Sequence, residues 1–165
     1  MKILFSEKQR FTQWWLWALI IVVNALIIYG FVQQIIFKTP FGNNPAPDVV
    51  LILVNFIPLG IAYLFYVLRL ETTITNEFIA FQFKPFQSKI NTIRWKELEN
   101  AYVRTYKPIR EFGGWGYRVS FTKGVAYNVG GHQGIQLVLK NGKKILIGTQ
   151  KAEEVQQILN DLNVH

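Results

Sequence analysis

Two long stretches without charge constrain this chain more than any other feature of its sequence. Residues 11–37 form a run of 27 positions without a charged side chain, and residues 49–68 form a second run of 20. A helix rises about 1.5 Å per residue, so the runs would be roughly 40 and 30 Å long, enough to cross a hydrocarbon layer of about 30 Å. Because backbone polar groups in lipid must be bonded within the segment, we expect two transmembrane helices.

The segment between the runs, residues 38–48, favours a tight reversal of the chain. Its sequence K-T-P-F-G-N-N-P-A-P-D is rich in residues that break helices and form turns, so the two helices should run antiparallel. The outer ends of the hairpin are flanked by the basic residues Lys2, Lys8, Arg10, Arg69 and Lys84, whereas the loop holds only Lys38. The positive-inside rule then predicts a multi-pass protein of the cytoplasmic membrane, with residues 1–10 as a basic cytoplasmic tail, an extracytoplasmic loop and both termini in the cytoplasm.

Three tryptophans stand at the start of the first run. Trp14, Trp15 and Trp17 follow directly after the basic residues Lys8 and Arg10. Tryptophan favours the membrane interface, where its ring is buried and its N–H stays hydrated, so we expect these side chains to anchor the helix there. Packing between helices is the alternative for Trp17.

The second run contains two residues that could serve a solute pathway. Pro58 lacks a backbone donor, and Asn55 could donate a hydrogen bond across to another helix. Packing of the hairpin, or contact between copies in a homo-oligomer, is the simpler interpretation. Neither run contains an ionisable Asp, Glu, Lys, Arg or His, which disfavours a transporter.

The composition narrows the class of partner. The formal net charge is +8, and residues 69–165 contribute 14 basic and 8 acidic side chains to it. Such an excess suits an anionic membrane surface. The charges are scattered and no nucleic-acid recognition motif accompanies them, so we do not expect nucleic acid as a partner. The chain has no cysteine, which excludes disulfides, thiolate zinc sites and thiol catalysis.

After Arg69 the apolar pattern changes to a period of two, which is typical of strands. The alternating positions are Ile79, Phe81 and Phe83; Tyr117, Val119 and Phe121; Val125, Tyr127 and Val129; and Ile135, Leu137 and Leu139. Residues 70–75 are expected to form the strand before the first of these, with Asn76-Glu77 at the turn. Weaker strand signals cover residues 89–95 and 101–106. Asn141-Gly142 before Ile145 and Ile147 favours the primed turn of a tight hairpin. Residues 69–165 are therefore expected to form a cytoplasmic domain of seven or eight antiparallel strands.

A final amphipathic helix is predicted after these strands. Thr149 is a plausible N-cap. An apolar stripe at helical spacing follows, formed by Ala152, Val155, Ile158, Leu159 and Leu162. Glu153 and Glu154 near the start suit the helix dipole. We expect this helix to cap an end of the sheet or barrel.

The order of these elements resembles that of bacterial pleckstrin-homology (PH)-like membrane proteins. The resemblance is carried by I-R-W-K-E-L at 93–98, by F-G-G-W-G at 112–116, and above all by G-I-Q-L-V-L-K-N-G-K-K-I-L-I-G-T-Q at 134–150. It implies an α+β protein whose partly open PH-type barrel is capped by the last helix. Relatives of this fold often bind phosphoinositides through basic residues between their first two strands. Here the corresponding turn, residues 75–77, has no Lys or Arg, so we do not transfer that activity.

The chain offers little material for catalysis. Its serines are Ser6, Ser88 and Ser120, and its histidines are His132 and His165. One histidine without neighbouring ligands makes a poor metal site, and no nucleophile stands next to a base. The glycine-rich residues 113–116 lack the Gly-Lys-Ser/Thr ending that a P-loop needs. We therefore expect neither an enzyme nor a cofactor, and interpret His132 as a surface loop residue.

Two surface features could carry function. The first is a basic set consisting of Arg104, Lys107, Arg110, Arg118 and Lys123, which could face anionic headgroups or form an ordinary solvated surface. The second is Trp115, which could insert into a partner or the membrane interface, or fold back onto the barrel. The leading hypothesis is a non-enzymatic, membrane-anchored module that contacts another protein and organises a complex. Binding to an anionic lipid surface is the alternative, and a membrane enzyme ranks third.

Overall fold

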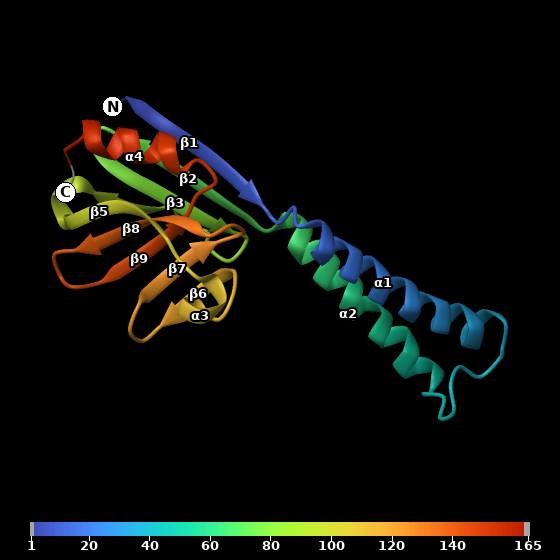
Figure 1. The fold of residues 1–165 in the computed structure, drawn as a ribbon. Helices are drawn as coiled ribbons and strands as arrows, with labels where there is room; N and C mark the ends of the chain where they lie inside the picture. The colour runs from blue at the N-terminus through green and yellow to red at the C-terminus, as the bar shows by residue number, and fades with distance from the viewer. Residues whose placement is uncertain (1, 164–165) are drawn as a thin grey trace. The chain divides into compact units, whose positions relative to one another are not determined.

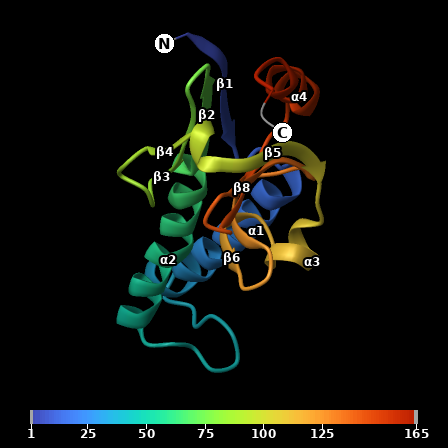
Figure 2. The ribbon, with the colours of Figure 1, turned by 90° about the vertical axis from the view of Figure 1, so that its left-hand side faces the viewer.

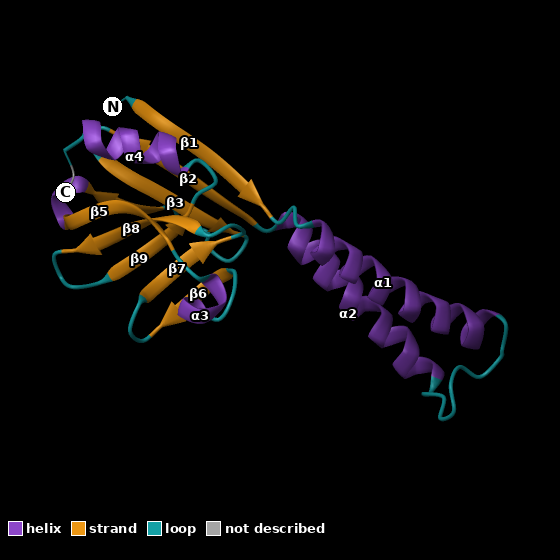
Figure 3. Cartoon of the chain, in the orientation of Figure 1, coloured by secondary structure: helices purple, strands orange, loops and turns teal. Residues whose placement is uncertain are grey.

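The chain folds as two compact units, and a computed structural model describes residues 2–163 of it (Figure 1). One unit consists of residues 12–67 and is helical. The other combines the segment before these residues with the segment after them, and contains two β-sheets and two short helices (Figure 3). The expected α+β class, with apolar helices and a separate β domain, is confirmed.

Two helices are long and apolar enough to cross a membrane. Helix α1 (Trp14–Phe31) continues as the π-helical turn η1 (Val32–Ile36), and α2 (Asp48–Val67) follows the loop, so the helices lie within a residue or a few of the predicted runs. Their buried residues are only Ile20 and Gly30 in α1 and Pro58 in α2. A core helix of a water-soluble protein would bury a full apolar face. These helices instead expose apolar side chains around their circumference, as helices surrounded by lipid do.

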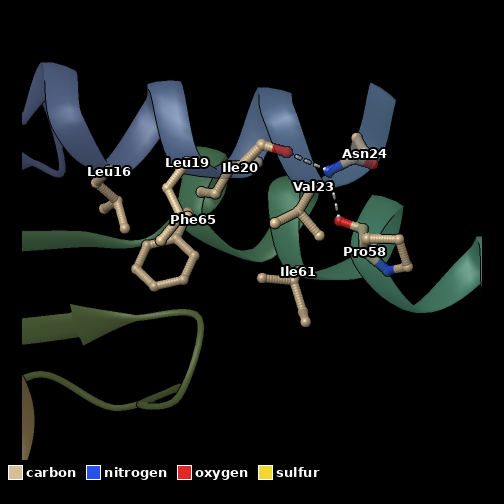
Figure 4. Close-up of a pocket in the computed structure, with 8 residues that line it drawn as sticks. All are labelled: Leu16, Leu19, Ile20, Val23, Asn24, Pro58, Ile61 and Phe65. Carbon is tan, nitrogen blue, oxygen red and sulfur yellow. Dashed lines mark hydrogen bonds between the residues drawn. The ribbon is translucent and has the colours of Figure 1, made fainter. Parts of the chain in front are cut away.

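The two helices contact each other around a small apolar pocket of about 250 Å³ (Figure 4). Asn24 lies at its edge, where its side-chain amide donates to the Ile20 carbonyl at 2.8 Å and to the Pro58 carbonyl of α2 at 3.4 Å. Asn55, which the sequence suggested for such a contact, donates instead to the Leu51 carbonyl of its own helix at 2.8 Å. At this pocket Asn24, rather than Asn55, therefore provides a polar contact between the helices.

One side chain that precedes the loop between the helices holds the far end of that loop. The Gln34 amide donates to the Ala46 carbonyl at 2.7 Å and to the Asp48 carboxylate at 2.8 Å. Phe41 turns back onto the helix, with its ring 5.8 Å from that of Tyr29 and against Gly30, where a Cβ would lie 2.9 Å from the ring. The predicted turn between antiparallel helices is thus an ordered structure.

The β unit contains nine strands in its described residues, arranged as two sheets (Figures 1 and 2). The four-stranded sheet has the order β1-β2-β3-β4, formed by Ile3–Arg10, Arg69–Thr75, Phe78–Lys84 and Asn91–Arg94. The five-stranded sheet has the order β5-β8-β9-β7-β6, formed by Leu98–Thr105, Gln133–Leu139, Lys144–Gly148, Gly124–Asn128 and Gly116–Ser120. A 3₁₀ turn, η2 (Trp95–Glu97), joins them.

This arrangement corrects the prediction of a partly open, antiparallel barrel of seven or eight strands. The sheets pack as two layers, with the ring of Phe81 in β3 4.9 Å from that of Tyr127 in β7. Strands β7 and β9 pair in parallel, through Val125↔Ile145 and Tyr127↔Ile147. Alternating apolar residues locate a strand, but they do not specify its neighbour or its direction, which is why the sequence could not distinguish these topologies.

The first ten residues differ from the expected basic tail. Residues 3–10 form β1, which pairs along its length with β2, from Ile3↔Thr75 to Arg10↔Arg69. The side chains facing inward are Phe5, Glu7 and Gln9, all buried. Two of the three are polar, so the strand lacks the apolar alternation that would have revealed it. The helical hairpin is therefore an insertion between two adjacent, paired strands of one sheet.

Glu7 connects β1 to the opposite sheet. Its carboxylate accepts hydrogen bonds from the Thr149 hydroxyl at 2.8 Å, the Gln150 N–H at 2.9 Å and the Gln9 amide at 3.1 Å. The same Gln9 amide donates to the Gly148 carbonyl at 2.7 Å. A carboxylate with three donors is adequately bonded despite its burial, and it joins the first strand to the segment that leads into the last helix.

We expect the Glu7→Ala variant to lose about 2 kcal/mol of unfolding free energy, because the buried Thr149 hydroxyl loses its acceptor and the Gln9 amide and Gln150 N–H each lose one hydrogen bond. Denaturant unfolding of the full chain in detergent, followed by the fluorescence of its tryptophans, measures this. Glu77→Ala serves as the control, since Glu77 is an exposed residue of the β2–β3 turn. Equal stability of the two variants would show that Glu7 does not hold β1 in place.

The C-terminal part agrees with the sequence in outline. Strands β8 and β9 form the predicted hairpin, but with a three-residue loop in which Gly142 takes a positive φ of 81° and the Leu139 N–H donates to the Lys143 carbonyl at 2.9 Å. This is a type I turn with a bulge rather than the two-residue primed turn. Helix α4 (Ala152–Asp161) packs against β5, β8 and β1. Its N-cap is Lys151 rather than Thr149. The Thr149 hydroxyl instead donates to the Glu7 carboxylate.

Candidate functional site

A short helix, α3 (Pro108–Phe112), organises the surface on which most of the candidate residues lie. Pro108 opens the helix, where its missing N–H costs nothing, and Gly113 ends it with a positive φ of 74°. Its buried residue Phe112 packs on the five-stranded sheet, where it clusters with Tyr106, Ala126 and Leu146. The opposite, exposed face carries Ile109 and Arg110.

Arg104 is committed to this local structure. Its guanidinium donates to the Glu111 carboxylate at 2.8 Å and to the Gln136 side-chain oxygen at 3.0 Å, and it lies 5.9 Å from the centre of the Tyr106 ring. The other Glu111 oxygen accepts from the Lys107 N–H at 2.7 Å, which closes the first turn of α3. Arg104 therefore has a structural role, and we no longer count it among the cations that could bind a ligand or partner.

The contacts of Glu111 with Arg104 and Lys107 should make the stability of the protein depend on pH. The hydrogen bond from Arg104 lowers the pKa of the Glu111 carboxyl below its ordinary 4.5, against the opposing effect of burial. A carboxyl whose pKa is lowered by folding stabilises the native state above its unfolded pKa, and this stabilisation is lost as the pH falls through the folded value. Glu111→Gln should therefore be less stable than the native chain at pH 7, by about 0.5–1 kcal/mol for a pair still partly solvated.

Below the lowered pKa of the folded state the difference should shrink towards zero, because the native Glu111 is then protonated as well. Denaturant unfolding of both proteins at pH 7 and at the lowest pH at which both still fold measures it. Glu99→Gln, at an exposed position, is the matched control and should show no such pH-dependent gap. A gap for Glu111→Gln that is equal at both pH values would contradict the assignment.

Trp115 lies beside α3 and forms a pocket with it. The indole N–H donates to the Gly131 carbonyl at 3.1 Å, and the Tyr106 N–H donates to the His132 carbonyl at 2.8 Å, so the loop between β7 and β8 is fixed next to α3. A pocket of about 180 Å³ results, lined by Lys107, Pro108, Ile109, Arg110, Trp115 and His132. We call it the Trp115 pocket.

The strand that follows this pocket is exposed on both faces. Strand β6 is the last strand of its sheet and pairs only with β7. Its predicted apolar alternation is present, but Tyr117, Val119 and Phe121 are all exposed, Val119 by 62%. The half-buried strand expected there is thus corrected, because side chains on both faces of β6 are exposed. Its remaining central side chain, Arg118, donates to the Trp115 carbonyl at 3.1 Å.

The structure therefore brings together some of the predicted residues and separates others. Lys107, Arg110 and Trp115 line one pocket, and Arg118 adjoins it through the Trp115 carbonyl. Lys123 lies in the β6–β7 turn, where its N–H donates to the Ser120 hydroxyl at 3.3 Å. No pattern in the sequence pointed to Ile109, whose side chain is 68% exposed in the structure. The sequence indicated only a loop position for His132.

The three candidate anchoring tryptophans lie in the first turns of α1. Trp14 and Trp15 are exposed, Trp14 by 80%, whereas Trp17 is only partly exposed. This pattern is compatible with the two roles that the sequence suggested, with Trp14 and Trp15 at an interface and Trp17 packing within the helical unit.

The chemistry of the Trp115 pocket suits recognition. Its lining surface is almost entirely apolar, although Lys107 and Arg110 are among the residues that form it. Such a pocket suits an apolar side chain of a ligand that also carries negative charge. In the part of the chain that the structure describes, no three His, Cys, Asp or Glu residues gather in a metal-binding arrangement. Burial raises the pKa of Tyr106 behind the pocket to about 12, so that hydroxyl stays protonated.

Known proteins provide no identification. Comparison of the chain with protein-family models, curated proteins and solved structures finds no match. The resemblance to PH-like proteins is therefore a hypothesis that depends on the sequence motifs and on the order of the elements.

Proposed function

We propose that this protein is a non-enzymatic, membrane-anchored adaptor of PH-like type. In this proposal α1 and α2 cross the cytoplasmic membrane, and the β unit lies at the cytoplasmic face, where it binds an extended segment of another protein. The observation that carries the proposal is the exposure of β6, an edge strand that presents apolar side chains to solvent next to the Trp115 pocket.

An edge strand with exposed apolar side chains is a liability unless something pairs with it or covers it. One common solution is for a partner peptide to add as a further strand, with its side chains contacting neighbouring pockets. Strand β6 has an unpaired outer edge in the described sheet, and the Trp115 pocket lies beside its first residue. This geometry supports binding of an extended segment.

The charges indicate what the segment would contain. Lys107, Arg110, Arg118 and Lys123 surround β6 and the pocket, and none of them forms an ion pair with a carboxylate of the described residues. A segment with acidic side chains between apolar ones would satisfy both the cations and the exposed apolar positions. We therefore expect an acidic and apolar partner sequence.

Site-specific photo-crosslinking in cells tests this proposal on the full chain. A photoreactive residue at Val119 should capture one protein reproducibly, through a peptide that mass spectrometry shows to be acidic and apolar. Combining it with Arg110→Glu should abolish the product, because the charge then repels the partner. The matched control places the crosslinker at Asn141, an exposed turn residue. The same products from both positions, or capture that survives the charge reversal, would contradict the proposal.

Binding to an anionic lipid surface is the second candidate, because the same four cations could contact headgroups. In that case the crosslinker at Val119 would capture lipid instead of a peptide. The yield should also rise with the fraction of anionic lipid in reconstituted vesicles and fall with added salt. A yield indifferent to lipid charge would remove this candidate.

A further inference from the structure

A separate row of cations crosses the four-stranded sheet, away from the Trp115 pocket in the sequence. Arg10 in β1 pairs with Arg69 in β2, and Arg69 pairs with Lys84 in β3. Directly paired residues of antiparallel strands project from the same face of the sheet. The three positive side chains therefore form one line across three strands, which we call the basic row.

The row lies on the outer face of the sheet. Along β1 the inward side chains are Phe5, Glu7 and Gln9, which are buried, so Lys8 and Arg10 point to the other side. Both are exposed, and Arg69 and Lys84 are partly exposed. The cations of the row are thus accessible to a ligand in solution or at a surface.

Glu71 compensates only part of this charge. Its carboxylate lies 2.9 Å from Arg69 Nε and 2.9 Å from Lys84 Nζ, and 3.9 Å from Lys8 Nζ. The hydrogen bond from Lys84 lowers the pKa of the Glu71 carboxyl, so it is ionised at neutral pH. Four cations and one carboxylate leave a net charge of +3, and Arg10 forms no ion pair within the described residues. Like charges placed directly opposite on a sheet are destabilising. An anionic ligand would remove this cost.

Two members of the basic row lie within a few residues, along the chain, of the ends of the apolar helices. Strand β1 ends at Arg10 and α1 begins at Trp14, and α2 ends at Val67 and β2 begins at Arg69. An extended chain spans at most about 3.6 Å per residue, so Arg69 lies within about 7 Å of the last residue of α2, whatever the orientation of the two units. If the helices end at the membrane surface, the row lies at the level of the lipid phosphates.

We propose that the basic row is a binding site for the phosphate group of an anionic lipid headgroup. Guanidinium groups bind phosphate oxygens through paired hydrogen bonds, and Lys84 adds a point charge on the same face. The site is distinct from the partner surface at β6. It rests on the proposed function only in requiring that α1 and α2 cross the membrane.

Native mass spectrometry of the full chain tests the site. The chain is reconstituted in vesicles of phosphatidylcholine and phosphatidylglycerol, extracted in mild detergent, and analysed for bound lipid. We expect phosphatidylglycerol to be retained at least tenfold over phosphatidylcholine. The triple variant Arg10→Gln, Arg69→Gln, Lys84→Gln should lose this preference. A matched triple variant, Lys96→Gln, Lys140→Gln, Lys143→Gln, removes the same charge from exposed positions elsewhere and should keep it.

Arg10→Gln alone guards against loss of folding, because it leaves all three contacts of Glu71 intact. It should reduce the preference about fivefold, the factor expected for one basic residue near an anionic surface. Equal losses in the two triple variants would overturn the site, since they would show a general effect of charge. Displacement of the bound lipid by millimolar inorganic phosphate would also overturn it, in favour of a soluble ligand. Incorporation into vesicles without any lipid preference refutes the site alone, whereas failure to incorporate refutes the membrane proposal as well.

Discussion

A chain in which a short turn replaces residues 12–67 is expected to fold and to leave the membrane fraction almost completely. Arg10 and Arg69 are directly paired, and the Cα atoms of such partners lie about 5 Å apart. A turn of two to four residues after Phe11 can therefore join β1 to β2 as an ordinary hairpin. The change removes both helices that could cross a membrane and keeps every strand.

Cell fractionation and circular dichroism measure this result. The shortened chain should be recovered in the soluble fraction, with the spectrum of a β protein and a cooperative thermal transition. The full chain, prepared in parallel, should stay with the membranes after washing at high salt. Recovery of the shortened chain in the membrane fraction would contradict the assignment of the helices as the anchor, as would recovery of the full chain in the soluble fraction.

Deleting residues 2–10 from this shortened chain should abolish its folding. The deletion exposes one edge of β2 and uncovers Leu70 and Ile74, which are fully buried in the intact unit. It also removes Phe5 and the Glu7 and Gln9 contacts with the β9–α4 segment. Small domains are stable by about 5–15 kcal/mol, and the loss of a whole strand with its buried side chains is of that size.

The measurement is again the thermal transition, now compared between two shortened chains. With β1 the protein should unfold cooperatively. Without it the circular dichroism signal should change gradually with temperature, and the amide proton resonances in an NMR spectrum should fall within a narrow range. Ser6→Ala, on the outer face of β1, is the control and should leave the transition almost unchanged. A cooperative transition after the deletion would show that residues 69–165 are a complete domain, as the sequence had suggested.

The sequence predicted well those features that depend on the spacing of apolar residues within a short stretch of the chain. The two helices follow from runs without charge, and the β8–β9 hairpin follows from alternation on both sides of Asn141-Gly142. Strand β3 was also found, although Gln82 and Ala80 on its second face are buried as well. In each case the period of the apolar residues is sufficient information.

The features that the sequence missed depend on contacts between distant segments. Strand β1 is hidden because Glu7 and Gln9 face inward, and their partners lie 139 to 143 residues away in the chain. The parallel pairing of β7 with β9 leaves no local signature. The exposure of Tyr117, Val119 and Phe121 also depends on whether other segments cover them, which alternation along β6 cannot reveal.

The candidate site shows the same division. Lys107, Arg110 and Trp115 are neighbours in the sequence, and the structure keeps them together. Its charge makes Arg104 a candidate for the basic set, but its guanidinium donates to Glu111 and Gln136 instead. His132 could not be placed beside Trp115 from the sequence, because the hydrogen bond from Trp115 to Gly131 that fixes its loop spans 16 residues.

The most direct test of the central claim, that α1 and α2 carry the chain across the membrane and back, uses the absence of native cysteine. Single cysteines are introduced as Asn43→Cys in the loop between the helices and as Lys143→Cys in the β8–β9 turn. Intact cells are then treated with a membrane-impermeant maleimide. We predict labelling of Asn43→Cys alone in intact cells and of both variants after permeabilisation. Labelling of Lys143→Cys in intact cells, or protection of Asn43→Cys until the cells are opened, would contradict it.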